Sequence, residues 1–243
     1  MTQRVGIFVS HPVQYHVPIW RDLAQSPELD VKVFFFSDHS VRGAVDPGFG
    51  VEVKWDMPLL EGYDSEFLSR EEKLESPMSV GLDNAEQVLR DGNFDWILIA
   101  GYMYRFELQL ARAARKLGIK VILRGELTDL RESPRIKTFV RTLFLRWFYR
   151  HITAFACVGD VARRHLERMG VKNDRIFFSP YCVDTTHFSS QIEELEREPA
   201  RQELQLTEDT FTFLFSGKLI DRKQILLLLK AFGKVSHEVR EKV

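Results

Sequence analysis

Short, strongly apolar runs alternate with longer segments of helical periodicity, and this alternation constrains the fold more than any other feature of the sequence. The apolar runs predict strands at residues 4–10, 31–37, 94–100, 120–123, 153–158 and 175–179. The segments between them predict helices that end near residues 25, 92, 117, 149 and 170. Alternating strands and helices are typical of a parallel sheet covered by helices. We therefore predict an α/β fold with a doubly wound parallel sheet of six or seven strands.

The region from residue 38 to residue 77 interrupts this alternation. Glycine and proline recur through it, which predicts turns and an irregular segment. Within it, residues 51–55 alternate between apolar and polar side chains, as a half-buried strand does. Asp83 and Glu86 then form the spacing of a capping box, which predicts the start of the next helix.

Composition and charge exclude several classes of protein. The net charge of −1 gives no reason to expect a nucleic-acid partner. The first twelve residues contain only a short apolar run, so we do not expect a secretory signal, and no apolar run approaches the ~20 residues of a membrane span. Cys157 and Cys182 lie in apolar surroundings without metal-ligand spacing, which predicts reduced, buried thiols in a cytoplasmic protein.

The last part of the chain begins a second strand–loop–helix unit. Residues 211–215 predict a strand, residues 216–223 a basic loop, and residue 224 the start of an apolar helix. Gly217, Lys218 and Lys223 lie where such a unit binds phosphate, although ordinary surface lysines would give the same pattern. Few residues follow, so we predict three segments: an N-terminal domain at 1–190, a linker helix at 191–210, and the incomplete beginning of a second domain at 211–243.

Polar side chains follow several of the predicted strands. They are His11, Gln14, Tyr15, His16, Tyr102, Arg124 and Glu126. The carboxyl ends of parallel strands share one edge of a sheet, so we expect these residues to line one cleft. Two alternatives stay open: that the histidines serve only as caps or packing groups, and that Arg124 pairs within its own loop with Glu126 or Asp129.

Three nucleotide and metal signatures are absent from the sequence. There is no G-x-G-x-x-G after the first strand, no phosphate-binding G-x-x-x-x-G-K-[ST] loop, and no Asp-x-Asp. A nicotinamide-dependent dehydrogenase is therefore the least favoured class. His11 and His16 have no acidic or cysteine partners nearby in the sequence, so we expect no metal there.

Residues 135–150 form a separate signal. Apolar residues recur at helical spacing, and five cations lie among them with no acidic residue between Glu132 and Asp160. A helix lying on an anionic membrane has this pattern, and so does a helix packed against a sheet. Peripheral contact with the inner face of a membrane and simple packing are both open.

Four stretches resemble the family 4 (group 1) glycosyltransferases of GT-B architecture. Residues 180–188, PYCVDTTHF, are similar to the P-x-G/A-V-D-x-x-x-F segment between the two domains of that family. Residues 217–223, GKLIDRK, resemble its G-[RK]-L-x-x-x-K loop. HPVQYH at 11–16 and LRGE at 123–126 are similar to a subgroup that acts in polysaccharide biosynthesis. Together these stretches span most of the chain.

The resemblance implies a retaining transferase with a nucleotide-sugar donor, no cofactor and no essential metal. It places Gly217, Lys218 and Lys223 on the donor diphosphate and the loops near His11 and Arg124 on the side of a glycan or lipid-linked acceptor. His-Pro replaces the family's glycine-rich loop, and Arg-Gly-Glu replaces its frequent histidine, so no catalytic residue is assigned. The E-x7-E region that binds the donor sugar is missing, so we expect the chain alone to be inactive. The rival interpretations are a non-enzymatic acceptor-binding or partner module and a nucleotide-sugar epimerase.

Overall fold

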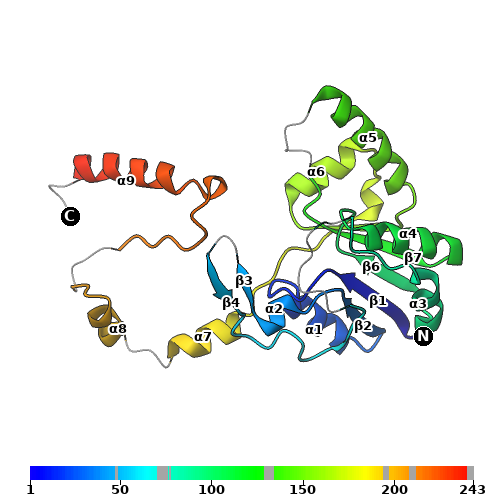
Figure 1. Ribbon diagram of the computed structural model, residues 1–243, viewed down its shortest axis with the longest axis horizontal. Helices are drawn as coiled ribbons and strands as arrows, with labels where there is room; N and C mark the ends of the chain where they lie inside the picture. The colour runs from blue at the N-terminus through cyan, green and yellow to red at the C-terminus, as the bar shows by residue number, and fades with distance from the viewer. Residues whose placement is uncertain are drawn as a thin grey trace. The chain divides into compact units, whose positions relative to one another are not determined.

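The computed structural model describes residues 1–46, 49–69, 76, 78–128, 134–193, 197–207 and 212–239 (Figure 1). The chain divides into two compact units. Unit 1 comprises Met1–Arg42 and Trp55–Thr185, and unit 2 comprises Gly43–Lys54 and Thr186–Val243.

A parallel sheet forms the centre of unit 1. In spatial order its seven strands are β5 (Asp64–Phe67), β2 (Leu29–Phe35), β1 (Gln3–Val9), β6 (Trp96–Ile99), β7 (Lys120–Gly125), β8 (Ala154–Cys157) and β9 (Ile176–Phe178). All six pairings are parallel, which confirms the predicted α/β sheet. The chain builds outward from β1 to β5 and then crosses to the other side of β1 with β6. The strand order therefore reverses between β1 and β6, where open α/β sheets bind their ligands.

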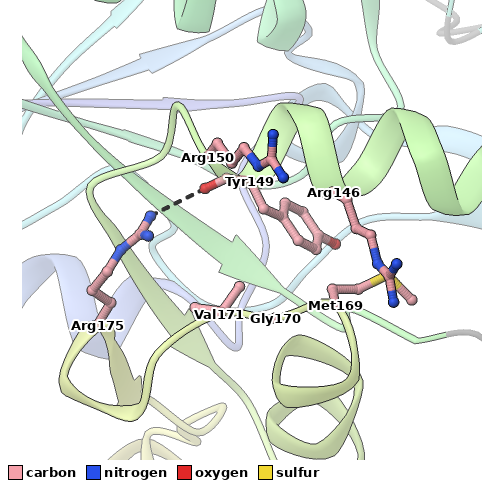
Figure 2. Close-up of a pocket in the computed structure, with 7 residues that line it drawn as sticks. All are labelled: Arg146, Tyr149, Arg150, Met169, Gly170, Val171 and Arg175. Atoms are coloured by element: carbon pink, nitrogen blue, oxygen red, sulfur yellow. Dashed lines mark hydrogen bonds between the residues drawn. The ribbon is translucent and has the colours of Figure 1, made fainter.

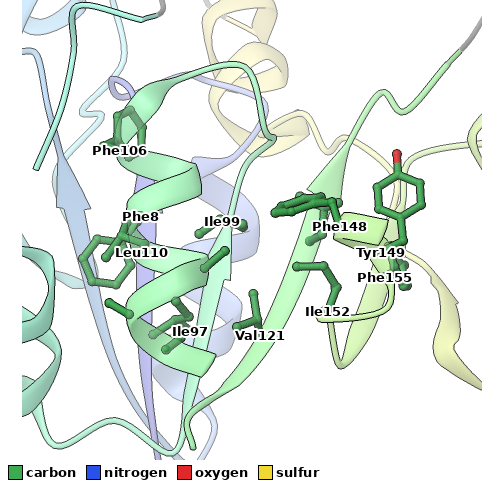
Figure 3. Packing of buried hydrophobic residues seen from close by; sticks show 14 of the residues in the cluster. Phe8, Ile97, Ile99, Phe106, Leu110, Val121, Phe148, Tyr149, Ile152 and Phe155 are labelled. Atoms are coloured by element: carbon green, nitrogen blue, oxygen red, sulfur yellow. The ribbon is translucent and has the colours of Figure 1, made fainter. Parts of the chain in front are cut away.

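The helices of unit 1 are α1 (Val17–Gln25), α2 (His39–Arg42), α3 (Ala85–Gly92), α4 (Arg105–Leu117), α5 (Arg135–Tyr149) and α6 (Asp160–Arg168). Successive residues of a strand point to opposite faces of the sheet, so β1 serves two cores. Ile7 packs in a cluster with Trp20 of α1, whereas Phe8 packs in the cluster that contains Leu110 of α4 (Figure 3). Burying each such side chain stabilises the fold by ~1.5–3 kcal/mol.

The region predicted to be irregular contains more regular structure than its sequence indicates. It holds α2, the hairpin of β3 (Ala44–Asp46) and β4 (Val51–Val53), and the edge strand β5. The predicted half-buried strand at 51–55 is shorter than expected and is wrong in its burial at Val51, which is exposed; among the described residues β4 pairs with β3 alone. Strand β5 has a mostly polar sequence, which an edge strand can tolerate because its backbone hydrogen bonds to β2 hold it in the sheet.

The capping box was assigned to the wrong helix. Asn84, and not Asp83, precedes α3, and its side chain makes no capping bond. The Asp83 carboxylate instead forms an ion pair with Arg105, with 2.5 Å between Oδ1 and Nη2. The capping interaction occurs at α4, where the Glu107 carboxylate accepts a hydrogen bond of 2.9 Å from the Tyr104 backbone N–H. The spacing of a capping motif is local, but the competing partner of Asp83 comes from another helix.

Helix α5 also differs from a helix packed on a sheet. Its buried residues are Leu145, Phe148 and Tyr149, which all lie in its second half. The apolar stripe identified in the sequence is exposed for most of its length. Packing on the sheet therefore does not account for the stripe.

Unit 2 contains α7 (Thr185–Glu193, which starts at the last residue of unit 1), α8 (Arg197–Glu203), a 3-10 turn (Asp221–Lys223) and α9 (Ile225–Val239). The predicted strand at 211–215 is not observed: residue 211 lies outside the described residues, and residues 212–215 pair with no other strand among those described. A strand needs a neighbour for its backbone groups, and an apolar run alone does not supply one. The Phe213 ring instead lies 5.5 Å from the Phe232 ring of α9. The predicted three-segment domain division stays a prediction.

Candidate functional site

The candidate site lies at the carboxyl ends of the unit 1 strands. The loops after β1, β2, β7 and β9 bring polar side chains together there, as the parallel sheet predicts. Strand β1 ends at Val9 and Ser10 follows, so the backbone leaves the sheet next to the point where the strand order reverses. This position supplies the first of the histidines.

His11 is held by contacts from two strands. Its Nδ1 atom lies 3.0 Å from the hydroxyl of Ser10, and its ring lies 4.5 Å from the ring of His39, which follows β2. His39 in turn has its Nδ1 atom 2.8 Å from the hydroxyl of Ser37. Burial, and secondarily the nearby His39, lower the pKa of His11 to about 4. The imidazole is therefore neutral at pH 7 and has a nitrogen able to accept a hydrogen bond.

His16 lies in an aromatic environment. Its ring is 5.5 Å from the ring of Trp20 and 5.6 Å from the ring of Tyr181. Burial first, and then the charge of Arg124 and the proximity of His11, lower the pKa of His16 to about 3. The buried Nδ1 atom of His16 has no hydrogen-bond partner among the described residues. It is the orphaned polar atom in this part of the molecule, and a ligand hydroxyl would satisfy it.

Arg124 at the end of β7 is 2% exposed. Its Nε donates to the Ser179 hydroxyl at 3.1 Å, and Nη2 donates to the Ser179 and Pro180 carbonyls at 3.3 and 3.0 Å. Burial lowers the pKa of the Arg124 guanidinium, although an arginine stays protonated in a protein. The proposed pairing of Arg124 within its own loop is therefore wrong for Glu126, and Asp129 lies outside the described residues. The guanidinium fastens β7 to the segment that follows β9.

Tyr181 completes this side of the site. Burial first, and then the nearby charge of Glu126, raise the pKa of the Tyr181 hydroxyl. The backbone carbonyl of Tyr15 accepts a hydrogen bond of 3.3 Å from the Cys182 N–H. The exposed ring of Tyr15 lies 5.8 Å from the Tyr181 ring. Four of the predicted residues, His11, His16, Arg124 and Glu126, thus belong to one connected cluster with Tyr181.

Tyr102 is placed differently from the other predicted residues. The Tyr102 hydroxyl accepts a hydrogen bond of 3.3 Å from Arg141 of α5, and its ring packs near Phe148. Gln14 is half-buried in the loop that carries His11 and His16. Cys157 is buried as expected, but Cys182 is only partly buried, and both thiols are free. Tyr102 therefore contacts α5, and the contacts it makes with described residues do not include the histidine cluster.

Glu107 is a site residue that sequence reasoning missed. It is 2% exposed, and burial raises the pKa of its carboxyl to about 7. Hydrogen bonds from the backbone N–H groups of Tyr104 and Met103 lower the same pKa, but their effect is smaller. Gly101 leaves space for the carboxyl, because a Cβ there would come 3.1 Å from Glu107 Oε1. Ser10, the residue before His11, lowers the pKa of the Tyr104 hydroxyl, so the start of this helix lies close to the loop that carries His11. The position of Glu107 three residues after Tyr104 was the available signal.

With this geometry established, comparison with known proteins gives the family. The profile of the glycosyl transferase 4-like domain matches residues 19–182, more than half of the chain. The chain belongs to this family. No curated protein sequence matches it.

Solved structures share the fold. A UDP-N-acetylglucosamine 2-epimerase from Rickettsia bellii matches with a TM-score of 0.54 at 14% identity, over 85% of this chain and 52% of that one. Another UDP-N-acetylglucosamine 2-epimerase matches with a TM-score of 0.52 at 17% identity, over 74% of this chain and 49% of that one. The UDP-GlcNAc 2-epimerase from Neisseria meningitidis, bound to UDP-GlcNAc, matches with a TM-score of 0.50 at 13% identity, over 84% of this chain and 52% of that one. The chain spans about half the length of these proteins.

Family membership and these structures establish a GT-B glycosyltransferase-like fold, and the family match indicates a function related to glycosyl transfer. The three predicted diphosphate residues of this glycosyl transferase 4-like chain lie in unit 2. Gly217 has a φ of 154°, a conformation that favours glycine. Lys218 Nζ lies 5.2 Å from the centre of the Phe49 ring, and the Lys223 backbone N–H donates to the Ile220 carbonyl at 2.9 Å.

Two searches of the described residues bear on cofactors and membranes. No group of three or more His, Cys, Asp or Glu side chains within them is placed to hold a metal ion. In the same part of the chain, no helix is long and apolar enough to cross a bilayer.

Proposed function

We propose that the chain is part of a retaining glycosyltransferase that moves a sugar from a nucleotide donor to a glycan or lipid-linked acceptor in polysaccharide biosynthesis. The observation that carries this proposal is the cluster of two neutral histidines and one buried arginine at the strand-order reversal of a glycosyl transferase 4-like sheet. We further propose that the protein works in the cytoplasm, at the inner face of a membrane.

The acceptor side follows from the chemistry of the cluster. Sugar hydroxyls donate hydrogen bonds, and neutral imidazoles accept them, whereas protonated imidazoles cannot. His11 and His16 are kept neutral by burial, and His16 has the orphaned Nδ1 atom described above. Aromatic rings such as that of Tyr15, which is exposed beside Tyr181, provide an apolar surface for the face of a sugar. These features support assigning His11, Tyr15, His16, Arg124 and Glu126 to the acceptor side, and the proposal also includes Gln14 from the same loop and Tyr102 from the loop after β6.

The donor side rests on unit 2. When the bond to the sugar breaks, negative charge grows on the departing nucleoside diphosphate, and nearby cations stabilise it. Lys218 and Lys223 lie in a short loop before α9, and Gly217 keeps the backbone before them free of a side chain. With two lysines available, no metal ion and no cofactor are needed in this proposal.

Calorimetric titration of the chain with UDP, GDP and their sugar conjugates tests the donor proposal. We expect one nucleotide series to bind, and Lys218→Ala and Lys223→Ala each to weaken binding by about tenfold, which corresponds to ~1.4 kcal/mol. Lys230→Ala, an exposed lysine of α9, is the matched control and should leave binding unchanged. If no nucleotide binds, the non-enzymatic acceptor-binding module replaces the transferase. If UDP-GlcNAc is consumed without an acceptor, an epimerase replaces it.

A further inference from the structure

Helix α5 exposes an apolar stripe to solvent. The exposed side chains are Ile136, Phe139, Val140, Leu143, Phe144 and Trp147, and Ile136 and Phe139 are 81% and 64% exposed. On a helix of ~3.6 residues per turn, these six positions span an arc of roughly 140°. Leu145 and Tyr149, which are buried, lie on the opposite side of the helix. The stripe therefore points away from the core of unit 1, and Figure 1 draws α5 on the outside of that unit.

Cations flank the stripe. Arg135 and Arg146 lie along one border of the arc and Lys137 lies along the other, with no acidic residue from 133 to 159. Long basic side chains beside an apolar stripe can reach back to a charged surface while their stems stay in apolar contact. The helix thus has the two features of an interfacial helix, on one exposed face.

A small cavity lies at the carboxyl end of α5. It has a volume of about 250 Å³ and is lined by Arg146, Tyr149, Arg150, Met169, Gly170, Val171 and Arg175 (Figure 2). Arg175 is fixed by hydrogen bonds to the Tyr149 and Thr153 carbonyls at 3.0 and 3.1 Å, and to the Ile152 carbonyl. Within the described part of the chain, Arg146 and Arg150 form no ion pair. Two unpaired guanidinium groups beside a third are a favourable environment for a phosphate.

We propose that α5 is a docking surface for an anionic lipid bilayer. The stripe enters the interface between headgroups and acyl chains, and Arg146 and Arg150 bind lipid phosphates at the cavity. The cations are attracted to an anionic membrane surface, and burial of the apolar side chains adds to the binding. A second copy of the chain fits the stripe less well, because a two-fold contact would bring the cations of both helices together.

This inference deepens the lipid-linked alternative of the proposed function, because a bilayer contact would bring the site to its acceptor. Binding to vesicles needs neither donor nor transfer. The docking surface and the transferase proposal can therefore fail separately, and vesicle binding by a chain that binds no nucleotide would support only the former.

Flotation of the full chain with vesicles tests the proposal. We expect binding to phosphatidylcholine vesicles that contain phosphatidylglycerol, weak binding to phosphatidylcholine alone, and loss of binding as salt screens the charges. Phe139→Ser with Trp147→Ser, and separately Arg146→Glu with Arg150→Glu, should each weaken binding at least about tenfold. All four side chains are exposed, so the thermal unfolding midpoint of each variant should stay close to that of the parent.

Two further double variants separate α5 from the rest of the surface. Arg112→Glu with Arg115→Glu places the same charge change on exposed positions of α4 and should leave vesicle binding nearly unchanged. Leu226→Ser with Leu229→Ser removes exposed apolar side chains from α9 and should also leave it unchanged. Quenching of Trp147 fluorescence by brominated lipids, absent in Trp147→Phe, would place the stripe in the bilayer.

Three results would overturn the inference. The first is no binding to either vesicle, and the second is binding that the α9 variant abolishes while the α5 variants keep it. The third is a dimer in solution, measured by analytical ultracentrifugation, that the Phe139→Ser with Trp147→Ser variant converts to monomer. In that case a second copy of the chain covers the stripe.

Discussion

The guanidinium carbon of Arg124 lies 5.2 Å from the centre of the Tyr181 ring. Arg124 ends one of the inner strands of the sheet, whereas Tyr181 follows the edge strand β9. Hydrogen bonds from the same guanidinium to residues 179 and 180 hold the two segments together. The buried arginine therefore shapes the site by fixing the aromatic ring that faces His16.

Replacing Arg124 should destabilise unit 1. Arg124→Lys keeps a positive charge but cannot reproduce the planar fork that reaches Ser179 and Pro180, so we expect a loss of ~1–3 kcal/mol in the free energy of unfolding. Urea denaturation measures this loss. Arg115→Lys, at an exposed position of α4, is the control and should change stability by less than ~0.5 kcal/mol. Equal effects at both positions would contradict the role of Arg124.

The stability of the fold should fall in acid because of His11 and His16. Their pKa values are about 4 and about 3 in the folded chain and 6.5 in the reference state, so the unfolded chain binds more protons below pH 6.5. The free energy of unfolding should decrease as the pH falls from 6.5 to 4, by on the order of 3 kcal/mol for His11 alone. Thermal unfolding across this range measures it. His11→Gln with His16→Gln should flatten the profile, and parallel profiles would refute this explanation.

Glu107 should act in the opposite direction. Its folded pKa of about 7 is above the reference value of 4.5, so the folded chain binds more protons in this window and loses stability as the pH rises through it. Glu107→Gln removes the titration while one amide oxygen can still accept the Tyr104 N–H. We expect the difference in unfolding midpoint between parent and variant to shift in favour of the variant from pH 5 to pH 8. A constant difference would show that Glu107 does not titrate in this range.

Asp184 should tie α1 to the segment after β9. Its carboxylate lies 3.0 Å from Arg21 Nη1, and the same arginine donates to the Pro58 and Glu61 carbonyls. Asp184→Asn removes the charge but keeps the shape, so we expect a loss of about 1–2 kcal/mol in urea denaturation. Glu86→Gln breaks the exposed contact with Lys116 and should have a much smaller effect. A loss at Asp184 no larger than that at Glu86 would mean that the partly buried pair adds nothing.

Local patterns predicted most of the sheet and part of the site. Six apolar runs of strand length each gave a strand of the seven-stranded sheet, whereas residues 212–215 of a further run pair with no strand among the described residues. Within that sheet only β5 lacked such a signal, because its sequence is mostly polar. His11, His16, Arg124 and Glu126 follow strands directly, so the parallel order was enough to place them at one edge. Tyr181, His39 and Glu107 join the same part of the molecule but carry no separate signal of proximity. Their roles depend on neighbours that are distant in sequence.

The sequence alone determined the α/β class, since the periods of strands and helices are properties of consecutive residues. Only the tertiary structure decided which polar groups meet. Arg124 binds Ser179, 55 positions away, and not Glu126 of its own loop. It also decided which side of α5 stays exposed and that residues 212–215 have no strand partner among those described. The physical reason is the same in each case: a partner or a covering surface comes from a remote part of the chain, and periodicity contains no information about it.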